Sequence, residues 1–227
     1  MWPIIWREIY DITTLPIICL MGSCWLGARH WQRLPASLKW MVMYLFFNLA
    51  IEIAARAASI LWGQNLPLLH LYTVGECILL SLFYHKILDE ESVFQRYFKW
   101  IVGITILLVV LNTIFLQSIF EFNSYGKTLV QLLIILFSLD YAFRFSEQTN
   151  TNIQLSRSIR LINSAVLIYY CGSLFVFMSS QFEIETRGAL QILWDFNTVL
   201  NLFFQIVVFI GLWKVLFQPQ KLSSSSA

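Results

Sequence analysis

The sequence predicts an all-α protein, a polytopic membrane helix bundle of seven transmembrane helices with the N-terminus outside and the C-terminus cytoplasmic. Three observations lead to this prediction: the composition, the spacing of apolar stretches and the unequal placement of basic residues. Of the 227 residues, 58% are apolar and 12% are charged, whereas a typical soluble domain is about 45–50% apolar and about 25% charged. A soluble protein of this composition would have too little polar surface to cover itself, so we expect a lipid bilayer around the chain.

Charge and cysteine usage exclude several other classes. The net charge is only +2 and no block of basic residues occurs, so no nucleic-acid partner is expected. The four cysteines lie inside apolar stretches and form no C-x-x-C pair. They are therefore predicted to be free core cysteines, without a zinc site or a disulfide framework.

Seven stretches reach the length of about 20 apolar residues that a helix needs to cross the hydrocarbon core. They cover residues 9–27, 40–62, 68–88, 100–119, 127–145, 161–180 and 190–213. The first is the weakest candidate, because it contains Asp11 and Pro16. The connections are short, so we expect one transmembrane domain over residues 1–217, followed by a disordered cytoplasmic tail over residues 218–227.

The Lys and Arg residues predict the direction of these spans. On one side of the membrane the seven-span arrangement places Arg7, Lys127 and Arg187. The other side receives Arg29, Arg33, Lys39, Lys86, Arg96, Lys99, Arg144, Arg157, Arg160, Lys214 and Lys221. Cytoplasmic loops carry the excess of basic residues in membrane proteins. The larger group is therefore predicted to be cytoplasmic, together with the C-terminus.

The second span contains Asn48, Glu52 and Arg56 at intervals of four residues, so the three side chains line one helix face. Glu followed by Arg one turn later is the favourable order for an ion pair. Two interpretations stay open. The pair is either a self-neutralised structural element or a buried charge site that binds a ligand or moves a proton.

The third span contains His70 and, near the membrane midplane, Glu76. Glu76 has no basic residue one turn away in its own helix, so it must be protonated, paired across helices or placed in a wet cavity. Arg56 lies at a compatible depth. Arg56 could therefore serve two carboxylates, and we expect it within ion-pair reach of at least one of Glu52 and Glu76.

The seventh span repeats the pattern, with Asn197, Asn201 and Gln205 at intervals of four residues and Asp195 nearby. Polar groups of three spans thus fall in the same outer-to-middle layer. This predicts a polar, water-accessible pocket that is open to the outside. The candidate ligand-binding or buried polar cluster comprises Asn48, Glu52, Arg56, His70, Glu76, Asp195, Asn197 and Asn201.

Cofactors are not expected from this pattern. A photoreceptor of the microbial-rhodopsin type needs a lysine in the middle of its last helix, and all six lysines fall at predicted span ends or in loops. We therefore expect no covalent retinal. No H-x-x-x-H or E-x-x-H spacing indicates a metal site. No catalytic residue is assigned.

A resemblance extends over most of the chain. The motifs that carry it are Asn65–Tyr72 followed by Glu76, Ile162–Ser164 with Tyr169 and Gly172, and the Asn197/Asn201 pair. In these motifs the chain resembles an uncharacterised seven-helix inner-membrane protein family of Bacteroidota-type bacteria. The resemblance implies a multi-pass protein of the bacterial inner (plasma) membrane. Similar seven-helix units can serve as membrane sensors associated with histidine kinases.

The predicted function is an integral membrane sensor or ligand-binding module. We expect no kinase or other output domain in these residues, so a separate signalling partner would have to bind the cytoplasmic face or meet the protein in the membrane. A homo-oligomer is compatible with the sequence. The alternative is an intramembrane hydrolase or lipid-modifying enzyme that uses Glu52, Glu76, Asp195 and His70. The sequence favours the non-enzymatic function.

Overall fold

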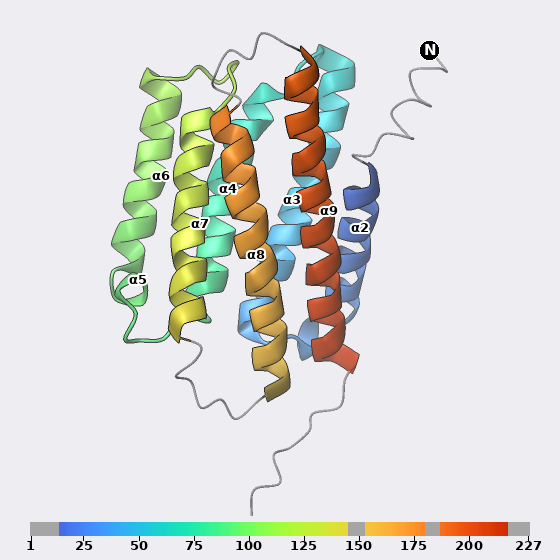
Figure 1. Cartoon of the computed structure of the whole chain (residues 1–227), viewed down its shortest axis with the longest axis vertical. Coiled ribbons are helices and arrows are strands. Elements are labelled where there is room, and N and C mark those ends of the chain that lie inside the picture. Colours follow the sequence, from blue (N-terminus) through green and yellow to red (C-terminus); the bar gives the residue numbers. More distant parts are fainter. Residues whose placement is uncertain (1–13, 145–152, 180–186, 218–227) are drawn as a thin grey trace, which may run out of the picture.

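A computed structural model describes residues 14–144, 153–179 and 187–217. These residues form an all-α bundle (Figure 1). Its helices are α2 (Thr14–Arg29), α3 (Ala36–Trp62), α4 (Leu66–His85), α5 (Val93–Arg96), α6 (Phe98–Phe115), α7 (Ser124–Arg144), α8 (Ile153–Ser179) and α9 (Arg187–Phe217), with a 3₁₀ turn, η1, over Trp31–Arg33. The predicted tail over 218–227 lies outside the described residues.

Six of the seven predicted spans are confirmed as helices long and apolar enough to cross a membrane: α3, α4, α6, α7, α8 and α9. These six candidates indicate a multi-pass membrane protein. The first predicted span, 9–27, is not among them. Its described part belongs to α2, which has 16 residues, and residues 9–13 lie outside the described part. The count of seven spans and their direction therefore stay predictions.

The helix boundaries differ most from the sequence prediction at α8. This helix begins at Ile153, eight residues before the predicted start at 161. The additional segment contains Arg157 and Arg160, which a search for apolar runs excludes. A helix needs no apolar side chains to continue beyond a membrane surface, since its backbone hydrogen bonds are internal.

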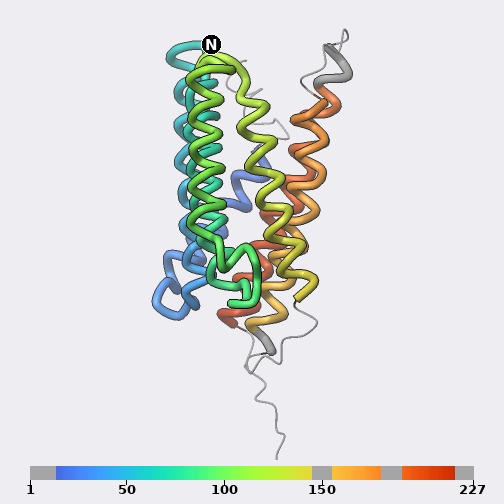
Figure 2. The backbone as a smooth tube through the Cα atoms, turned by 90° about the vertical axis from the view of Figure 1, so that its left-hand side faces the viewer, coloured from blue at the N-terminus to red at the C-terminus, as the bar shows by residue number. Residues whose placement is uncertain are grey.

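The long helices pack as a ring with one outer member. Contacts join α2 to α3, α3 to α4, α4 to α7, α7 to α8, α8 to α9 and α9 back to α2. Helix α6 packs on the outside of this ring, against α4 and α7. Figure 2 shows the helices aligned along one direction, with their connections at the two ends of the bundle.

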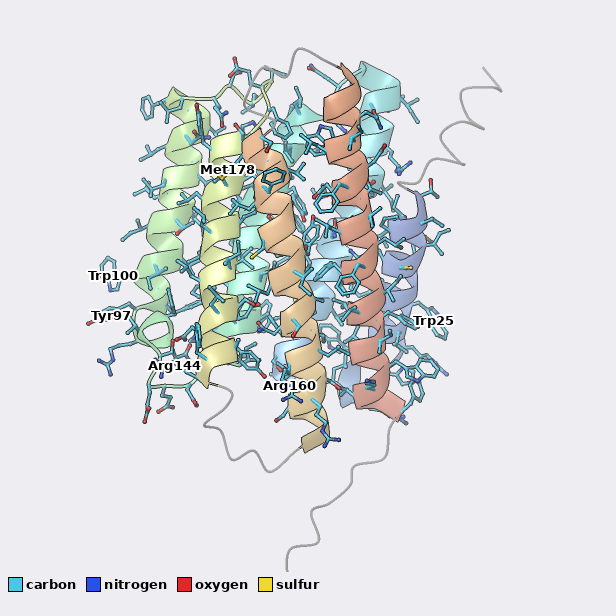
Figure 3. The ribbon with its side chains drawn as sticks, in the orientation of Figure 1. Trp25, Tyr97, Trp100, Arg144, Arg160 and Met178 are labelled. Carbon is cyan, nitrogen blue, oxygen red and sulfur yellow. The ribbon has the colours of Figure 1, made fainter. Side chains whose placement is uncertain are left out.

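We call these two ends, as oriented in Figure 1, the upper end and the lower end. The upper end carries Gly63–Asn65 and Leu116–Asn123, and the lower end carries η1 and Lys86–Ser92. The lower end holds most of the described basic residues. Arg144 and Arg160 lie there, at the end of α7 and in the first two turns of α8 (Figure 3).

The outer surface of the bundle is apolar over the length of the helices. Trp25 and Trp100 are 68% and 73% exposed and point away from the bundle (Figure 3). Polar and aromatic side chains instead fill parts of the interior, among them Tyr44, Tyr170 and Gln131. This distribution is the reverse of a water-soluble protein and suits a bilayer as solvent.

Candidate ligand site and buried charge cluster

The centre of the bundle contains a fully buried ion pair. Glu76 of α4 and Lys127 of α7 are 0% and 1% exposed, and the Lys127 ammonium donates a hydrogen bond to Glu76 Oε2. A charge at this depth is costly unless it is paired and hydrogen-bonded. This pairing meets the first requirement for both residues.

Tyrosine hydroxyls meet the second requirement. The other carboxylate oxygen, Glu76 Oε1, accepts hydrogen bonds from Tyr72 and Tyr170, each at 2.7 Å. Tyr44 lies 3.1 Å from the Tyr72 hydroxyl and 3.4 Å from the Tyr170 hydroxyl. Because both of those hydroxyls donate to Glu76, the single Tyr44 proton is donated to one of them at a time. We call Tyr44, Tyr72, Glu76, Lys127 and Tyr170 the charge cluster.

The Lys127 ammonium also lies over aromatic rings. Its Nζ atom is 4.4 Å from the ring centre of Tyr72 and 5.6 Å from that of Phe177. A cation over an aromatic face is attracted by the ring quadrupole, and more strongly where water is excluded. The charge cluster therefore joins four helices, α3, α4, α7 and α8, through one carboxylate and one ammonium.

The α6–α7 connection positions Lys127. Asn123 is fully buried. Its side-chain amide nitrogen donates a hydrogen bond to Thr73 Oγ1 of α4 at 3.3 Å. Its amide oxygen, Oδ1, accepts a hydrogen bond from the Asn112 side chain of α6, also at 3.3 Å. A side chain at Gly126 would bring its Cβ to 2.4 Å from Asn123 Oδ1. Glycine at 126 therefore lets the Asn123 side chain pack against the first turn of α7. In this arrangement Lys127 lies on the face of α7 that is directed toward α4.

The structure corrects two expectations about this cluster. Arg56 reaches Glu52, as expected of at least one of the two carboxylates, but the described cation beside Glu76 is Lys127 and not a shared Arg56. Lys127 was expected at a span end, on the outer side of the membrane, yet its side chain lies in the core, although its backbone is in the first turn of α7. Of the three states that the sequence left open for Glu76, pairing across helices is the one found.

Sequence spacing could not identify this partner, since Glu76 and Lys127 are 51 residues apart. One signal was present: Lys127 begins a predicted span, and Glu76 lacked a basic neighbour in its own helix. Tyr170 could be expected from the sequence to hydrogen-bond into the core, but nothing in the sequence indicated Glu76 as its acceptor, because aromatic residues are common throughout the chain.

A cavity of about 310 Å³, which we call the outer cavity, lies beside the charge cluster. It extends from Asn65 and Phe122 at the upper end to the deeper side chains of Asn48, Glu52 and Asn201. Five aromatic residues line it: Tyr72, Phe122, Tyr169, Phe177 and Trp194. Tyr72 and Phe177 thus contact both the outer cavity and the Lys127 ammonium.

A smaller cavity of about 160 Å³ lies between α2, α3 and α9. It shares Asn48, Glu52 and Asn201 with the outer cavity. Gln205 lines it and donates to Asn201 Oδ1 at 3.3 Å, while Gln205 Oε1 has no hydrogen-bond partner within the described part of the chain. The polar stripe of α9 therefore points into the bundle beside Glu52.

The Glu52–Arg56 pair forms within α3, as its spacing predicted. Arg56 Nε donates to Glu52 Oε1 at 3.3 Å. The side chains are 39% exposed for Glu52 and 32% for Arg56. The pair is thus half-exposed, in contrast to the buried Glu76–Lys127 pair.

The remaining predicted residues are dispersed. His70 lies between α4 and the α6–α7 connection, where its ring nitrogens are 3.0 Å from Thr113 Oγ1 and 3.2 Å from the Glu121 carbonyl. Asp195 accepts from Gln191 at 2.9 Å. Asn197 is half-buried, and its Oδ1 has no partner among the described residues. Of the eight candidates, Asn48, Glu52 and Asn201 line the outer cavity.

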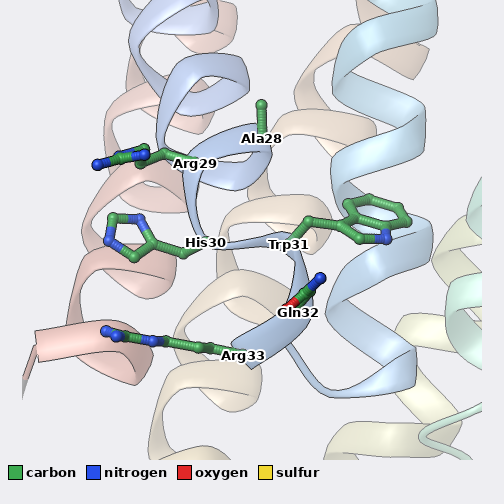
Figure 4. Close-up of a pocket in the computed structure, with 6 residues that line it drawn as sticks. All are labelled: Ala28, Arg29, His30, Trp31, Gln32 and Arg33. Atoms are coloured by element: carbon green, nitrogen blue, oxygen red, sulfur yellow. The ribbon is translucent and has the colours of Figure 1, made fainter.

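A separate hollow of about 490 Å³ lies at the lower end, formed by Ala28–Arg33. Arg29, His30 and Arg33 extend to one side of it, and Trp31 extends to the other (Figure 4). Its basic residues belong to the basic lower end of the bundle. The hollow is formed at the opposite end of the helices from Asn65 and Phe122, so it is no part of the outer cavity.

The comparisons with known proteins give no further guidance. The chain matches no family model, no curated protein and no solved structure. The resemblance to a seven-helix inner-membrane family therefore stays a prediction.

Proposed function

We propose that this protein is a membrane sensor or ligand-binding module whose outer cavity takes up a small molecule from outside the cell. In this proposal seven helices span the inner membrane, with the N-terminus outside and the lower end in the cytoplasm. The basic residues of the lower end support this direction. Helix α2 would form the described part of the first span.

One observation carries the proposal: Tyr72 lines the outer cavity and also donates a hydrogen bond to Glu76 of the charge cluster. A ligand that displaces Tyr72 changes the hydrogen bonding of a buried carboxylate. Because Glu76 also binds Lys127 and Tyr170, that change reaches α7 and α8. Occupancy of the cavity would in this way alter helix packing down to the cytoplasmic face, where a separate partner would bind.

The alternative hydrolase finds no support in the arrangement of its residues. Glu76, His70 and Asp195 have separate sets of hydrogen-bond partners. No group of three or more metal-ligating side chains occurs in residues 14–144, 153–179 and 187–217.

Thiol labelling of whole cells tests the proposal. In a background without the four native cysteines, Asn48→Cys and Asn201→Cys should react with an impermeant reagent added outside. Exposed Gln64 at the upper end serves as the positive control, and Glu90 at the lower end should react only in inside-out vesicles. Fully buried Gln131 is the control for an inaccessible core position. Labelling of Glu90→Cys from outside would refute the direction, and protection of both cavity positions would refute an outward-open site.

A further inference from the structure

The outer cavity places a half-exposed carboxylate deep in an apolar helix. Glu52 lies ten residues from Trp62, which corresponds to about 15 Å along α3. Its Oε1 atom accepts from Arg56 at 3.3 Å, and its second oxygen accepts no hydrogen bond from the described residues. A carboxylate at such a depth requires a polar or cationic neighbour. This oxygen is therefore available to a hydrogen-bond donor that enters the cavity.

Aromatic side chains also line this cavity. The rings of Phe122, Phe177 and Trp194 lie 5.3 to 5.6 Å from one another, centre to centre. Rings of this kind, beside a carboxylate, are the groups by which proteins recognise ammonium compounds. Within this molecule the Lys127 ammonium already lies over the rings of Tyr72 and Phe177.

The charge of the lining sets the sign of the ligand. Among the described residues that line the cavity, Glu52 is the charged one and none is Lys, Arg or His; Arg56, the helical partner of Glu52, is not part of this lining. An anion would be repelled by Glu52 and would lose its hydration without compensation. A neutral molecule would leave the second Glu52 oxygen without a charged partner.

We propose that the outer cavity binds a small organic ammonium compound, with Glu52 as its counter-charge and the rings of Phe122, Phe177 and Trp194 around its apolar part. This inference rests on the proposed function, since it names the ligand class of the same cavity. Asn48 and Asn201 supply further amide oxygens for a primary ammonium. The volume of about 310 Å³ lies at the lower limit of typical ligand sites, about 300–1,000 Å³, so the ligand is small.

Calorimetric titration of the purified full chain in detergent tests the ligand class. The probes are phenethylamine, 2-phenylethanol and phenylacetate, which share one ring and differ in the charge of the head group. Phenethylamine should bind at least about tenfold more tightly than 2-phenylethanol, the factor that corresponds to about 1.4 kcal/mol. Phenylacetate should not bind. Equal binding of the amine and the alcohol, or tighter binding of phenylacetate, overturns the proposal.

Two variants assign the effect to the cavity. Glu52→Gln should reduce phenethylamine binding to the level of 2-phenylethanol and leave the alcohol unaffected, which also shows that the variant is folded. Trp194→Leu should weaken both. The matched control is Asp140→Asn, because Asp140 also pairs with an arginine one turn later, Arg144, at 2.9 Å, but lies at the lower end of α7. It should bind all three probes as the unmodified protein does.

The failure of this inference differs from the failure of the proposed function. If Asn48→Cys and Asn201→Cys are labelled from outside but no probe shows the expected preference, the cavity is accessible and the ammonium assignment is wrong. If neither position is labelled, the outward-open site itself is wrong.

Discussion

Two acid–base pairs of this bundle differ in almost every physical respect. Glu76 and Lys127 come from different helices and are 0% and 1% exposed. Glu52 and Arg56 lie one turn apart on α3, with side chains that are 39% and 32% exposed. The first pair has both carboxylate oxygens hydrogen-bonded, and the second leaves one Glu52 oxygen without a hydrogen bond from the described residues.

This difference assigns different roles to the two pairs. A buried pair that lost one partner would leave an uncompensated charge, so the Glu76–Lys127 pair is needed for stability. A half-exposed pair contributes little, because solvent screens it and two side chains must be ordered to form it. In the proposed function, Glu52 would exchange part of its interaction for a ligand, whereas Glu76 would respond through Tyr72.

The largest effect is expected from Lys127→Met. Removal of the ammonium leaves the Glu76 carboxylate buried with two tyrosine hydroxyls, which should lower the free energy of unfolding by about 3–5 kcal/mol. Titration of the detergent-solubilised protein with sodium dodecyl sulfate measures this loss. The double variant Lys127→Met/Glu76→Gln is the control, and it should recover most of the stability because no charge is then stranded. A double variant as unstable as the single one would contradict the pairing.

The next largest effect is expected from Tyr170→Phe. This change removes a 2.7 Å hydrogen bond to the Glu76 carboxylate, and hydrogen bonds to charged groups contribute about 1.5–3 kcal/mol. Tyr44→Phe removes contacts between neutral hydroxyls at 3.1 and 3.4 Å, so its cost should be about 0.5–1.5 kcal/mol. The same titration compares the two variants. Equal losses would show that Glu76 does not depend on Tyr170.

A packing change beside the cluster should have an intermediate effect. A side chain at Gly75 would bring its Cβ to 2.2 Å from the Phe47 ring, which stacks on Tyr72 at 6.3 Å. Gly75→Ala must therefore displace Phe47 and then Tyr72, at a cost of about 1–3 kcal/mol. Gly103 is the matched control, because nothing lies within 4 Å of a Cβ there. Thermal unfolding should show a loss for Gly75→Ala and none for Gly103→Ala.

The smallest effect is expected from Arg56→Ala. The half-exposed Arg56 side chain should contribute about 0–1 kcal/mol through its pair with Glu52. A guanidinium shared by Glu52 and Glu76 would instead imply a large loss of stability on removal of Arg56. Thermal unfolding of Arg56→Ala beside Lys127→Met measures the contrast directly. A loss as large as that of Lys127→Met would mean that Arg56, and not Lys127, carries the buried charge balance.

Parts of the candidate site could be predicted from the sequence and parts could not. The i, i+4 spacing of Glu52 and Arg56 was sufficient for their pair, because one helical turn brings the two side chains together. The same reasoning assigned Glu76 to Arg56 on depth alone. Depth along a helix leaves the direction of a side chain around the axis open, so it could not choose between two cations.

The sequence by itself predicted which segments are long and apolar enough to cross a bilayer, because a run of apolar residues of that length is a local property of the chain. Six helices agree with that pattern. Only the tertiary structure decided that Lys127 neutralises Glu76 and that Tyr72 joins this pair to the outer cavity. Those contacts depend on the packing of α4 against α7 and on the rotation of each helix about its axis. Hydropathy contains little information about either, since lipid and protein interior are similarly apolar surroundings.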